Sequence, residues 1–372
     1  MKIAYVSDAI YPYNKGGKEK RLIDITTRLV SQGHEVHVYC MKWWKDPELH
    51  RVERGVHLHA ISPLYPLYTG ERRSIKQGVL FGLACLKLIK EDWDVIDVDH
   101  MPFFPVIFTK IVCLLKGKKM FATWHEVWGF EYWKKYIGWK APIAYLIEKF
   151  SIFLPDEVIS VTEDTARSIK RVLGRKYRIS IIRSGLDAEH IDEIPESPKH
   201  SDIVYAGRLL KHKNVHLILK SVALLKNKGN SIKAIIIGNG PEKKRLIKLT
   251  EKLQIQNLIE FIDFLPKHAQ AISIIKSSKV FVFPSEREGF GLVAIEANAC
   301  GIPFITSNHF ENAAQHLIER NNGLTFELTE ESLAKAIEKQ LSNLQDKEVY
   351  MSVARKYDWE KSMKELIHLY TV

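Results

Sequence analysis

Short apolar runs alternate with amphipathic helical stretches along most of this chain. Runs of strand length occur in the first half at residues 2–7, 35–40, 55–61, 94–98, 120–124 and 157–161. Leu22, Ile25 and Leu29 recur at spacings of three and four, which indicates a helix between the first two runs. Strands that alternate with helices are typical of parallel sheets covered by helices. The first half therefore predicts a Rossmann-like α/β domain.

The same alternation starts again in the second half. Strand-type runs occur at residues 202–206, 234–237, 260–262, 281–283, 303–306 and 322–326. Residues 188–201 are polar and contain prolines, so they predict a linker between the two halves. A chain of 372 residues is long enough for two domains. We therefore expect similar α/β domains over residues 1–185 and 186–356.

The stretch 281–303, FVFPSEREGFGLVAIEANACGIP, carries the most specific chemistry. Its pattern predicts a strand, a glycine-containing loop and then a helix. Such a unit directs backbone N–H groups and the positive end of a helix at one point, which suits a phosphate. Glu288 and Glu296 lie in the same unit, and ionised carboxylates accept hydrogen bonds from sugar hydroxyls. Together these features indicate a pocket for a nucleotide sugar.

Basic residues follow the first strand of the second half. In GRLLKHKN, Arg208 and Lys213 flank the turn at which a phosphate would bind. Arginine can hold a phosphate through two bonds, and lysine supplies a point charge. In the first half, Gly16 and Gly17 precede the first helix without forming G-x-G-x-x-G, so a dinucleotide site is not indicated.

These motifs resemble those of the retaining glycosyltransferases of the large family 4 type. Glu288 and Glu296 match the spacing of the family's E-x7-E motif, GRLLKHKN resembles its diphosphate-binding pair, and GNGPE at 238–242 matches its G-x-G-P-E turn. The resemblance covers most of the chain and is most specific over 207–323. It implies a glycosyltransferase B fold, with two Rossmann-like parallel-sheet domains facing across a cleft. It also implies that a C-terminal helix, 357–372, packs back on the first domain.

The resemblance implies transfer of a sugar from a nucleoside diphosphate donor, with retention of the anomeric configuration. Glu288 would hold the hydroxyls of the transferring sugar and Glu296 the ribose, while the leaving phosphate could take the acceptor's proton. The residues with an implied catalytic role are Arg208, Lys213, Glu288 and His125. Those with an implied donor-binding role are Gly16, Gly17, Gly207, Gly238, Phe264, Gly289, Phe290, Gly291, Leu292, Val293 and Glu296.

Asp97 and Asp99 form a D-x-D pair, which binds a metal-bound nucleotide in a different class of glycosyltransferase. Here the pair ends a strand of the first domain, far in sequence from the donor motifs. We therefore expect no metal and no cofactor, since the nucleotide sugar is a substrate. The four cysteines are scattered without metal-ligand spacing and fit reduced thiols in a cytosolic protein.

The net charge of +11 lies almost wholly in the first half, where 30 Lys and Arg face 20 Asp and Glu over residues 1–185. Within this half, 127–153 interleaves aromatic and basic residues, including Trp133 and Trp139. An interfacial patch on an anionic membrane and an ordinary buried helix pair both fit this composition. No nucleic-acid-binding motif is present.

No run of 18 apolar residues occurs, and the first residues lack the apolar core of a signal peptide. These observations favour a cytoplasmic protein, with peripheral attachment to the inner face of the cell membrane as one option. The acceptor is expected to be lipid-linked or a cell-envelope glycan. Two rival functions stay open: a nucleotide-sugar epimerase of the same fold, and a non-catalytic nucleotide-sugar-binding protein at a membrane surface.

Overall fold

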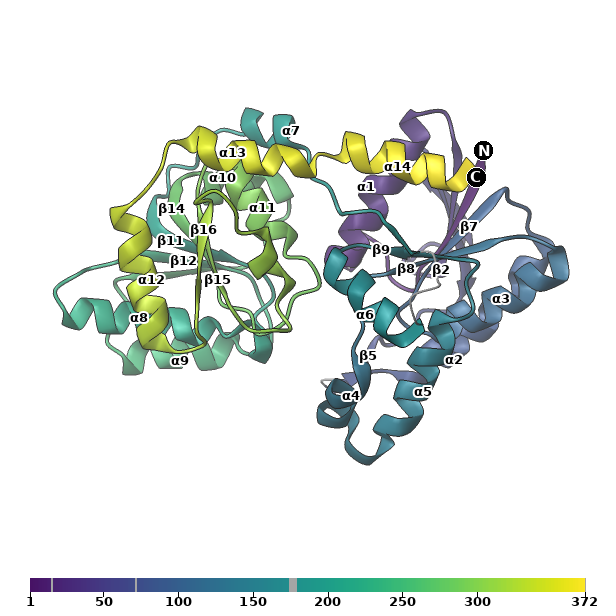
Figure 1. Cartoon of the computed structure of the whole chain (residues 1–372), viewed down its shortest axis with the longest axis horizontal. Helices are drawn as coiled ribbons and strands as arrows, with labels where there is room; N and C mark the ends of the chain where they lie inside the picture. Colours follow the sequence, from purple (N-terminus) through teal and green to yellow (C-terminus); the bar gives the residue numbers. More distant parts are fainter. Residues whose placement is uncertain (15, 71, 174–178, 372) are drawn as a thin grey trace. The chain divides into compact units, whose positions relative to one another are not determined.

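The computed structural model describes residues 1–14, 16–70, 72–173 and 179–371. The chain divides into two compact units (Figure 1). Unit 1 comprises Met1–Arg183 and Ser362–Val372, and unit 2 comprises Ser184–Lys361. The boundaries expected from the sequence, 185/186 and 356/357, lie within a few residues of these divisions.

Unit 1 is built on an eight-stranded sheet with the order β10-β9-β8-β7-β1-β2-β4-β3. Neighbouring strands run parallel, except that β3 pairs antiparallel with β4 at one edge. The central strands are buried along almost their whole length, because helices cover both faces of a parallel sheet. The strands are β1 (Lys2–Val6), β2 (Glu35–Met41), β3 (His50–Glu53), β4 (Val56–Ser62), β7 (Val95–Asp99), β8 (Met120–Trp124), β9 (Glu157–Ser160) and β10 (Ile179–Ile181), with a separate pair, β5 (Tyr68–Thr69) and β6 (Arg72–Arg73).

Helices connect the strands of unit 1. In the first of them, Leu22, Ile25 and Leu29 are buried, as their spacing predicts. The strand expected at 120–124 is observed over the same residues as β8. The helices are α1 (Gly17–Ser31), α2 (Ile75–Ala84), η1 (Cys85–Lys90), α3 (Phe104–Lys116), α4 (Gly129–Ile137), η2 (Gly138–Lys140), α5 (Ala141–Ile152) and α6 (Glu163–Leu173).

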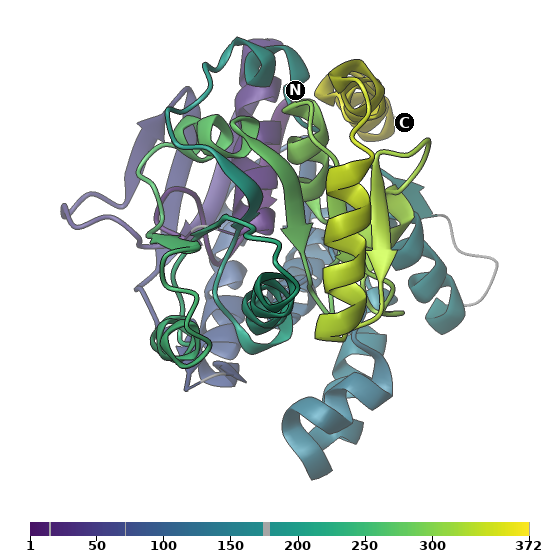
Figure 2. The same cartoon turned by 90° about the vertical axis from the view of Figure 1, so that its left-hand side faces the viewer.

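Unit 2 contains a six-stranded sheet with the order β13-β12-β11-β14-β15-β16, parallel throughout. Its strands are β11 (Ser201–Ala206), β12 (Ala234–Ile237), β13 (Ile259–Ile262), β14 (Ser278–Phe283), β15 (Phe304–Ser307) and β16 (Gly323–Phe326). Its helices are α7 (Ala188–Glu193), η3 (Lys211–Lys213), α8 (Val215–Asn227), α9 (Lys243–Lys252), α10 (His268–Lys276), α11 (Leu292–Ala299), η4 (Ala313–Leu317), α12 (Glu330–Ser342), α13 (Lys347–Ala354) and η5 (Arg355–Tyr357). Figure 2 shows α12 against the sheet.

The linker predicted at 188–201 is wrong in part, because it begins with helix α7. The carboxylate of Asp187 caps this helix by accepting from the backbone N–H of His190. Ile191 and Ile194 lie in the hydrophobic core of unit 2. A cap followed by two isoleucines three apart is a helix signal that the surrounding polar residues obscured.

The last helix, α14 (Trp359–Thr371), joins unit 1 over most of its length. The Tyr370 hydroxyl donates to Asp97 Oδ2 at 2.7 Å and lies 3.0 Å from the hydroxyl of Tyr5. All three side chains are buried, so this contact ties the C-terminal helix to β1 and β7. None of the helices in the described ranges has the length and apolar character needed to cross a bilayer.

Candidate functional site

In unit 2, two sequence-predicted residues meet where β11 and β14 end. Lys213, in the turn η3 after β11, forms an ion pair with Glu288 in the loop after β14, and both side chains are largely buried. The ammonium group also lies 5.2 Å from the centre of the Phe283 ring. The pair brings a cation and an acid together at the carboxyl ends of parallel strands, where α/β folds bind ligands.

Backbone hydrogen bonds fix the loop that carries Glu288. The N–H of Glu286 donates to the carbonyl of His212 at 2.8 Å, which joins this loop to η3. On its other side, the N–H of Glu288 donates to Glu311, and the carbonyl of Glu288 accepts from Ala313. The carboxylate is therefore held on a loop that is tied to two neighbouring segments.

Positive charge surrounds the turn after β11. Burial, and then the charges of Lys213, Arg287 and Arg208, lower the pKa of His212 to about 3. The Arg208 side chain is exposed and makes no ion pair with a described residue. Burial and these three cations keep the imidazole neutral, and the cations create a local field that attracts an anion. Sequence reasoning found Arg208 and Lys213 but missed His212 and Arg287.

Glycines shape the backbone around this turn. Gly291 caps α11 with a φ of 93°, a conformation that favours glycine, and an added Cβ would lie 2.6 Å from Ala314 Cβ. An added Cβ at Gly238 would overlap the carbonyl oxygen of Gly207, so the turns after β11 and β12 approach closely. The other loop residues implied by the resemblance, Gly289, Phe290, Leu292 and Val293, are half-buried.

Glu296 lies in α11 and is almost fully buried. Its carboxylate pairs with His268 Nε2 at 3.1 Å, at the start of α10. His268 was not singled out from the sequence, since only the fold brings these two helices together. Phe264, in the loop after β13, is 41% exposed and available for contact with a planar group.

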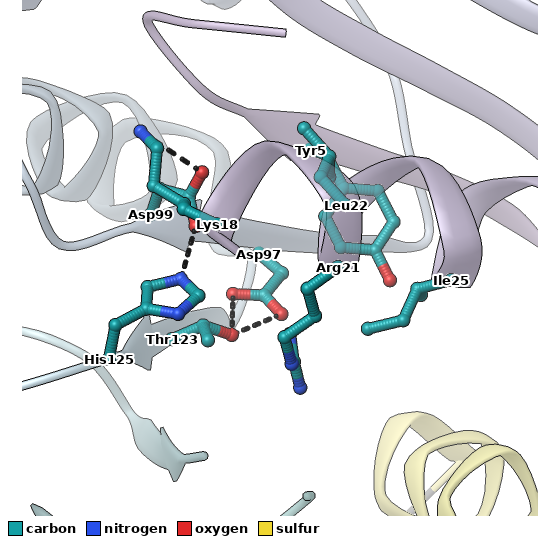
Figure 3. A pocket seen from close by; sticks show the side chains of 9 residues that line it. All are labelled: Tyr5, Lys18, Arg21, Leu22, Ile25, Asp97, Asp99, Thr123 and His125. Atoms are coloured by element: carbon teal, nitrogen blue, oxygen red, sulfur yellow. Dashed lines mark hydrogen bonds and ion pairs between the residues drawn. The ribbon is translucent and has the colours of Figure 1, made fainter. Parts of the chain in front are cut away.

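In unit 1, polar side chains gather where β1, β7 and β8 end (Figure 3). Lys18 Nζ lies 2.8 Å from Asp8 Oδ1 and 3.5 Å from Asp99 Oδ2, and His125 Nε2 lies 3.2 Å from Asp99 Oδ1. Arg73 binds the second oxygen of Asp8 at 2.7 Å. The structure thus places His125 in a charged network whose other members were not predicted as site residues.

Oppositely charged groups in this network favour each other's ionised forms. Although burial opposes charge on both groups, the Asp8 and Asp99 carboxylates raise the pKa of Lys18, and Lys18 and His125 lower the pKa of Asp99. Gly16 caps α1, and an added Cβ there would collide with the Glu19 carboxylate. A donor-binding role for Gly16 and Gly17 stays a prediction.

The D-x-D carboxylates have protein partners. Thr123 and Tyr370 donate to Asp97, whose pKa burial raises, while Asp99 pairs with Lys18 and His125. Among the described residues, one other group could share an ion: ligand atoms of Glu286, His309 and Glu311 all lie within 4.8 Å of one another. No local pattern in the sequence marks this group, because its members come from the loops after β14 and β15.

Two family sequence models match the chain in succession. The model described as Glycosyltransferase Family 4 matches residues 15–190, and the model described as Glycosyl transferases group 1 matches residues 187–357. Solved structures share the fold over the whole chain. Sucrose-phosphate synthase from Thermosynechococcus elongatus aligns with a TM-score of 0.79 at 18% identity, covering 99% of this chain and 98% of that one.

HepE from Anabaena, in complex with UDP and glucose, aligns with a TM-score of 0.74 at 17% identity, covering 100% and 99% of the two chains. The structure therefore has the glycosyltransferase B fold, with two Rossmann-like domains of parallel sheet. The chain belongs to the group 1 glycosyltransferases, with a family 4 N-terminal region.

Relatives with assigned names match over part of their length. The capsular polysaccharide biosynthesis glycosyltransferase CapM of Staphylococcus aureus is 28% identical over 232 residues, which is 55% of this chain and 57% of CapM. The gpi3 subunit of phosphatidylinositol N-acetylglucosaminyltransferase of Schizosaccharomyces pombe is 23% identical over 81% of this chain and 65% of the subunit. The chain thus spans less than two thirds of these relatives.

Proposed function

We propose that this protein is a retaining glycosyltransferase that takes a sugar from a nucleoside diphosphate donor without a metal ion. The observation that carries the proposal is the ion pair of Lys213 with Glu288, beside an imidazole that burial and nearby cations keep neutral. A diphosphate requires positive charge and a sugar requires hydroxyl acceptors, and these two needs meet in this pair.

Departure of the nucleoside diphosphate builds negative charge on its β-phosphate. Arg208 and Lys213 stabilise that charge, and the N-terminus of α11 behind Gly291 adds backbone N–H groups. Because the cations belong to the protein, no metal is needed for this task. The leaving phosphate accepts the acceptor's proton on the same face of the sugar, which accounts for retention.

The acids have separate roles in this proposal. Glu288, oriented by Lys213, accepts hydrogen bonds from hydroxyls of the transferring sugar. Glu296 binds the ribose, and its pairing with His268 orients the carboxylate inside the unit. Phe264 contacts the base. For His125, Gly16 and Gly17, which lie in unit 1, the role in the reaction is proposed from the motif resemblance alone.

The donor and acceptor classes rest on the named relatives. HepE is described in complex with UDP and glucose, which makes a UDP-hexose the first donor to test. CapM is named for capsular polysaccharide and the yeast subunit for phosphatidylinositol. We therefore propose a lipid-linked or cell-envelope glycan acceptor, and a cytoplasmic enzyme that attaches peripherally to the inner face of the membrane.

The test is incubation with a panel of UDP-, GDP- and ADP-sugars, with and without glycolipid acceptors, followed by NMR of the products. Release of the nucleotide together with an α-linked product from an α-linked donor supports the proposal. An epimerised donor would identify the epimerase alternative. Binding of a nucleotide sugar without turnover would identify the non-catalytic alternative.

A further inference from the structure

The helical hairpin formed by α4, η2 and α5 stands out from the rest of unit 1. It projects away from the sheet in both views (Figures 1 and 2). Between its two helices, Gly138 has a φ of 63°, which lets the chain reverse direction. The hairpin coincides with the aromatic and basic segment 127–153, for which an interfacial patch and a buried helix pair were both open.

One face of the hairpin is an ordinary core. Trp133 is 8% exposed and packs with Phe103 and Ala141. The buried Glu148 carboxylate accepts the Trp133 indole N–H at 2.9 Å and the backbone N–H groups of Trp128 and Gly129. Of the two options left open by the sequence, Trp133 therefore fits the buried helix pair, because α5 covers it.

The opposite face of α5 is apolar and uncovered in unit 1. Ile143 is 62% exposed, Leu146 65% and Phe150 52%, at spacings of three and four residues that align them on one side of the helix. Trp139, in the turn between the helices, is 83% exposed. We call these four residues the outer row. Side chains this large are seldom left in water as a continuous row unless they meet a partner.

Basic side chains lie on the same hairpin as the outer row, and Lys140 Nζ is 5.5 Å from the centre of the Trp139 ring. The exposed lysines of the hairpin have no ion-pair partner among the described residues, and they are Lys134, Lys135, Lys140 and Lys149. Glu131 is the one exposed acid between residues 129 and 153. An apolar row with lysines on the same hairpin fits an interface at which lipid chains lie below anionic headgroups. A second copy of the chain would instead bring the lysines of two hairpins together.

The hairpin is also attached to the network that contains His125. The hydroxyl of Tyr136 in α4 accepts from the backbone N–H of Arg73 at 2.8 Å, and the guanidinium of Arg73 binds Asp8 at 2.7 Å. Asp8 in turn binds Lys18, which lies beside Asp99 and His125 (Figure 3). A surface that holds the hairpin would therefore lie at the same end of unit 1 as these polar residues.

We infer that the outer row, with the lysines of the hairpin, docks on an anionic lipid bilayer. Trp139 and the side chains of α5 enter the interfacial region, and the lysines bind headgroups. This inference specifies the membrane partner of the proposed glycosyltransferase and rests on that function only for its biological purpose.

The test is co-sedimentation of the full chain with phosphatidylglycerol–phosphatidylcholine vesicles and with pure phosphatidylcholine vesicles at low salt. The triple variant Ile143→Ser, Leu146→Ser, Phe150→Ser should bind anionic vesicles at least about tenfold more weakly, because its apolar area is lost. The control is Leu114→Ser, Leu115→Ser at the end of α3, since these leucines are 69% and 73% exposed outside the hairpin. The control should bind like the unmodified chain.

Three results would overturn the inference. They are absence of binding to anionic vesicles, equal binding by the triple variant and the unmodified chain, and a dimer in light scattering that the triple variant abolishes. The last result would assign the outer row to a second copy. Donor hydrolysis without vesicles tests the proposed function separately. Vesicle binding without turnover of any donor would support the docking surface and would contradict the proposed glycosyltransferase activity.

Discussion

Lys213 and Glu288 form an ion pair across 75 residues of sequence, between the turn after β11 and the loop after β14. The pair lets one side chain set the position of the other, so under the proposed function a change at either should affect binding of the transferring sugar and of the leaving phosphate together. Without Glu288, the Lys213 side chain would lose this ion-pair partner, and nothing in the pair would then hold it in place.

Replacing Lys213 or Arg208 with alanine should lower turnover by about a hundredfold or more, as loss of a charge-stabilising donor in a preorganised site does. The measurement is the rate of nucleotide release at a saturating donor concentration, with thermal unfolding as a check on folding. The matched control is Lys211→Ala, an exposed lysine in the same turn, which should keep nearly full turnover. Near-normal rates in both Lys213→Ala and Arg208→Ala would remove the two residues from the mechanism.

Chelation should leave the activity intact. In the proposed mechanism, the cations of the turn after β11 supply the charge that a metal would otherwise provide. The D-x-D carboxylates already bind protein groups. The assay is turnover in excess EDTA, with His309→Ala as a companion variant because His309 belongs to the group that could share an ion. Loss of activity in EDTA with recovery on adding Mn²⁺ or Mg²⁺ would contradict the prediction.

Stability should fall on acidification, because of a cluster of histidines on β2, β3 and β4. His37 Nδ1 lies 2.8 Å from His59 Nε2, the His57 ring stacks on His37, and the His50 ring lies tilted against His59. Glu35 and Lys2 lie nearby. Burial and the neighbouring histidines lower the pKa of His59 to about 4, and burial lowers the pKa of His37.

A histidine with a lowered pKa in the folded state binds fewer protons there than in the unfolded chain. The contribution of His59 to the free energy of unfolding is therefore complete above about pH 6.5, and it is lost as the pH falls toward 4. We expect the free energy of unfolding to drop by on the order of 1 kcal/mol between pH 7 and pH 5, after allowance for solvent screening. Urea titrations at both pH values measure the drop.

His59→Gln should reduce this pH dependence, and replacement of the exposed His190 on α7 should leave it unchanged. An identical pH dependence in His59→Gln and the unmodified chain would exclude the cluster as its source.

Tyr370→Phe should destabilise unit 1 by about 1–3 kcal/mol, because it leaves the buried Asp97 with one hydrogen-bond donor fewer. Urea unfolding followed by tryptophan fluorescence reports this change, because the buried Trp93 and Trp124 lie in unit 1. Thr371→Val, at an exposed position of the same helix, is the control. Equal midpoints for Tyr370→Phe and the unmodified chain would mean that the contact contributes little.

Local patterns were enough to predict the central strands. Every residue of β12 is apolar and buried, and residues 234–237 carry that signal without help from the rest of the chain. The edge strand β3, with the sequence HRVE, was missed because it alternates only weakly and pairs with one neighbour. The burial of Trp133 and the exposure of Trp139 could not be predicted from the sequence either. Both look interfacial in the sequence, and only the packing of α4 on α5 buries the first and exposes the second.

The site residues divide in the same way. Arg208, Lys213, Glu288 and Glu296 stand in motifs whose spacing can be recognised in the sequence. The partners His268, Lys18 and Arg73 acquire their positions from contacts over long sequence separations, and no local pattern marks them. Those contacts therefore became visible only in the folded chain.

The bond between Tyr370 and Asp97 joins residues 273 positions apart, with the whole of unit 2 between them. During synthesis at about 5–20 residues per second, roughly 14 to 55 seconds separate the emergence of the two partners from the ribosome. Unit 2 ends at Lys361, nine positions before Tyr370, so unit 1 waits through the synthesis of almost all of unit 2 with the Asp97 carboxyl lacking its last donor. A cell that makes this protein must keep the earlier half of the chain out of aggregates until the later half has been completed.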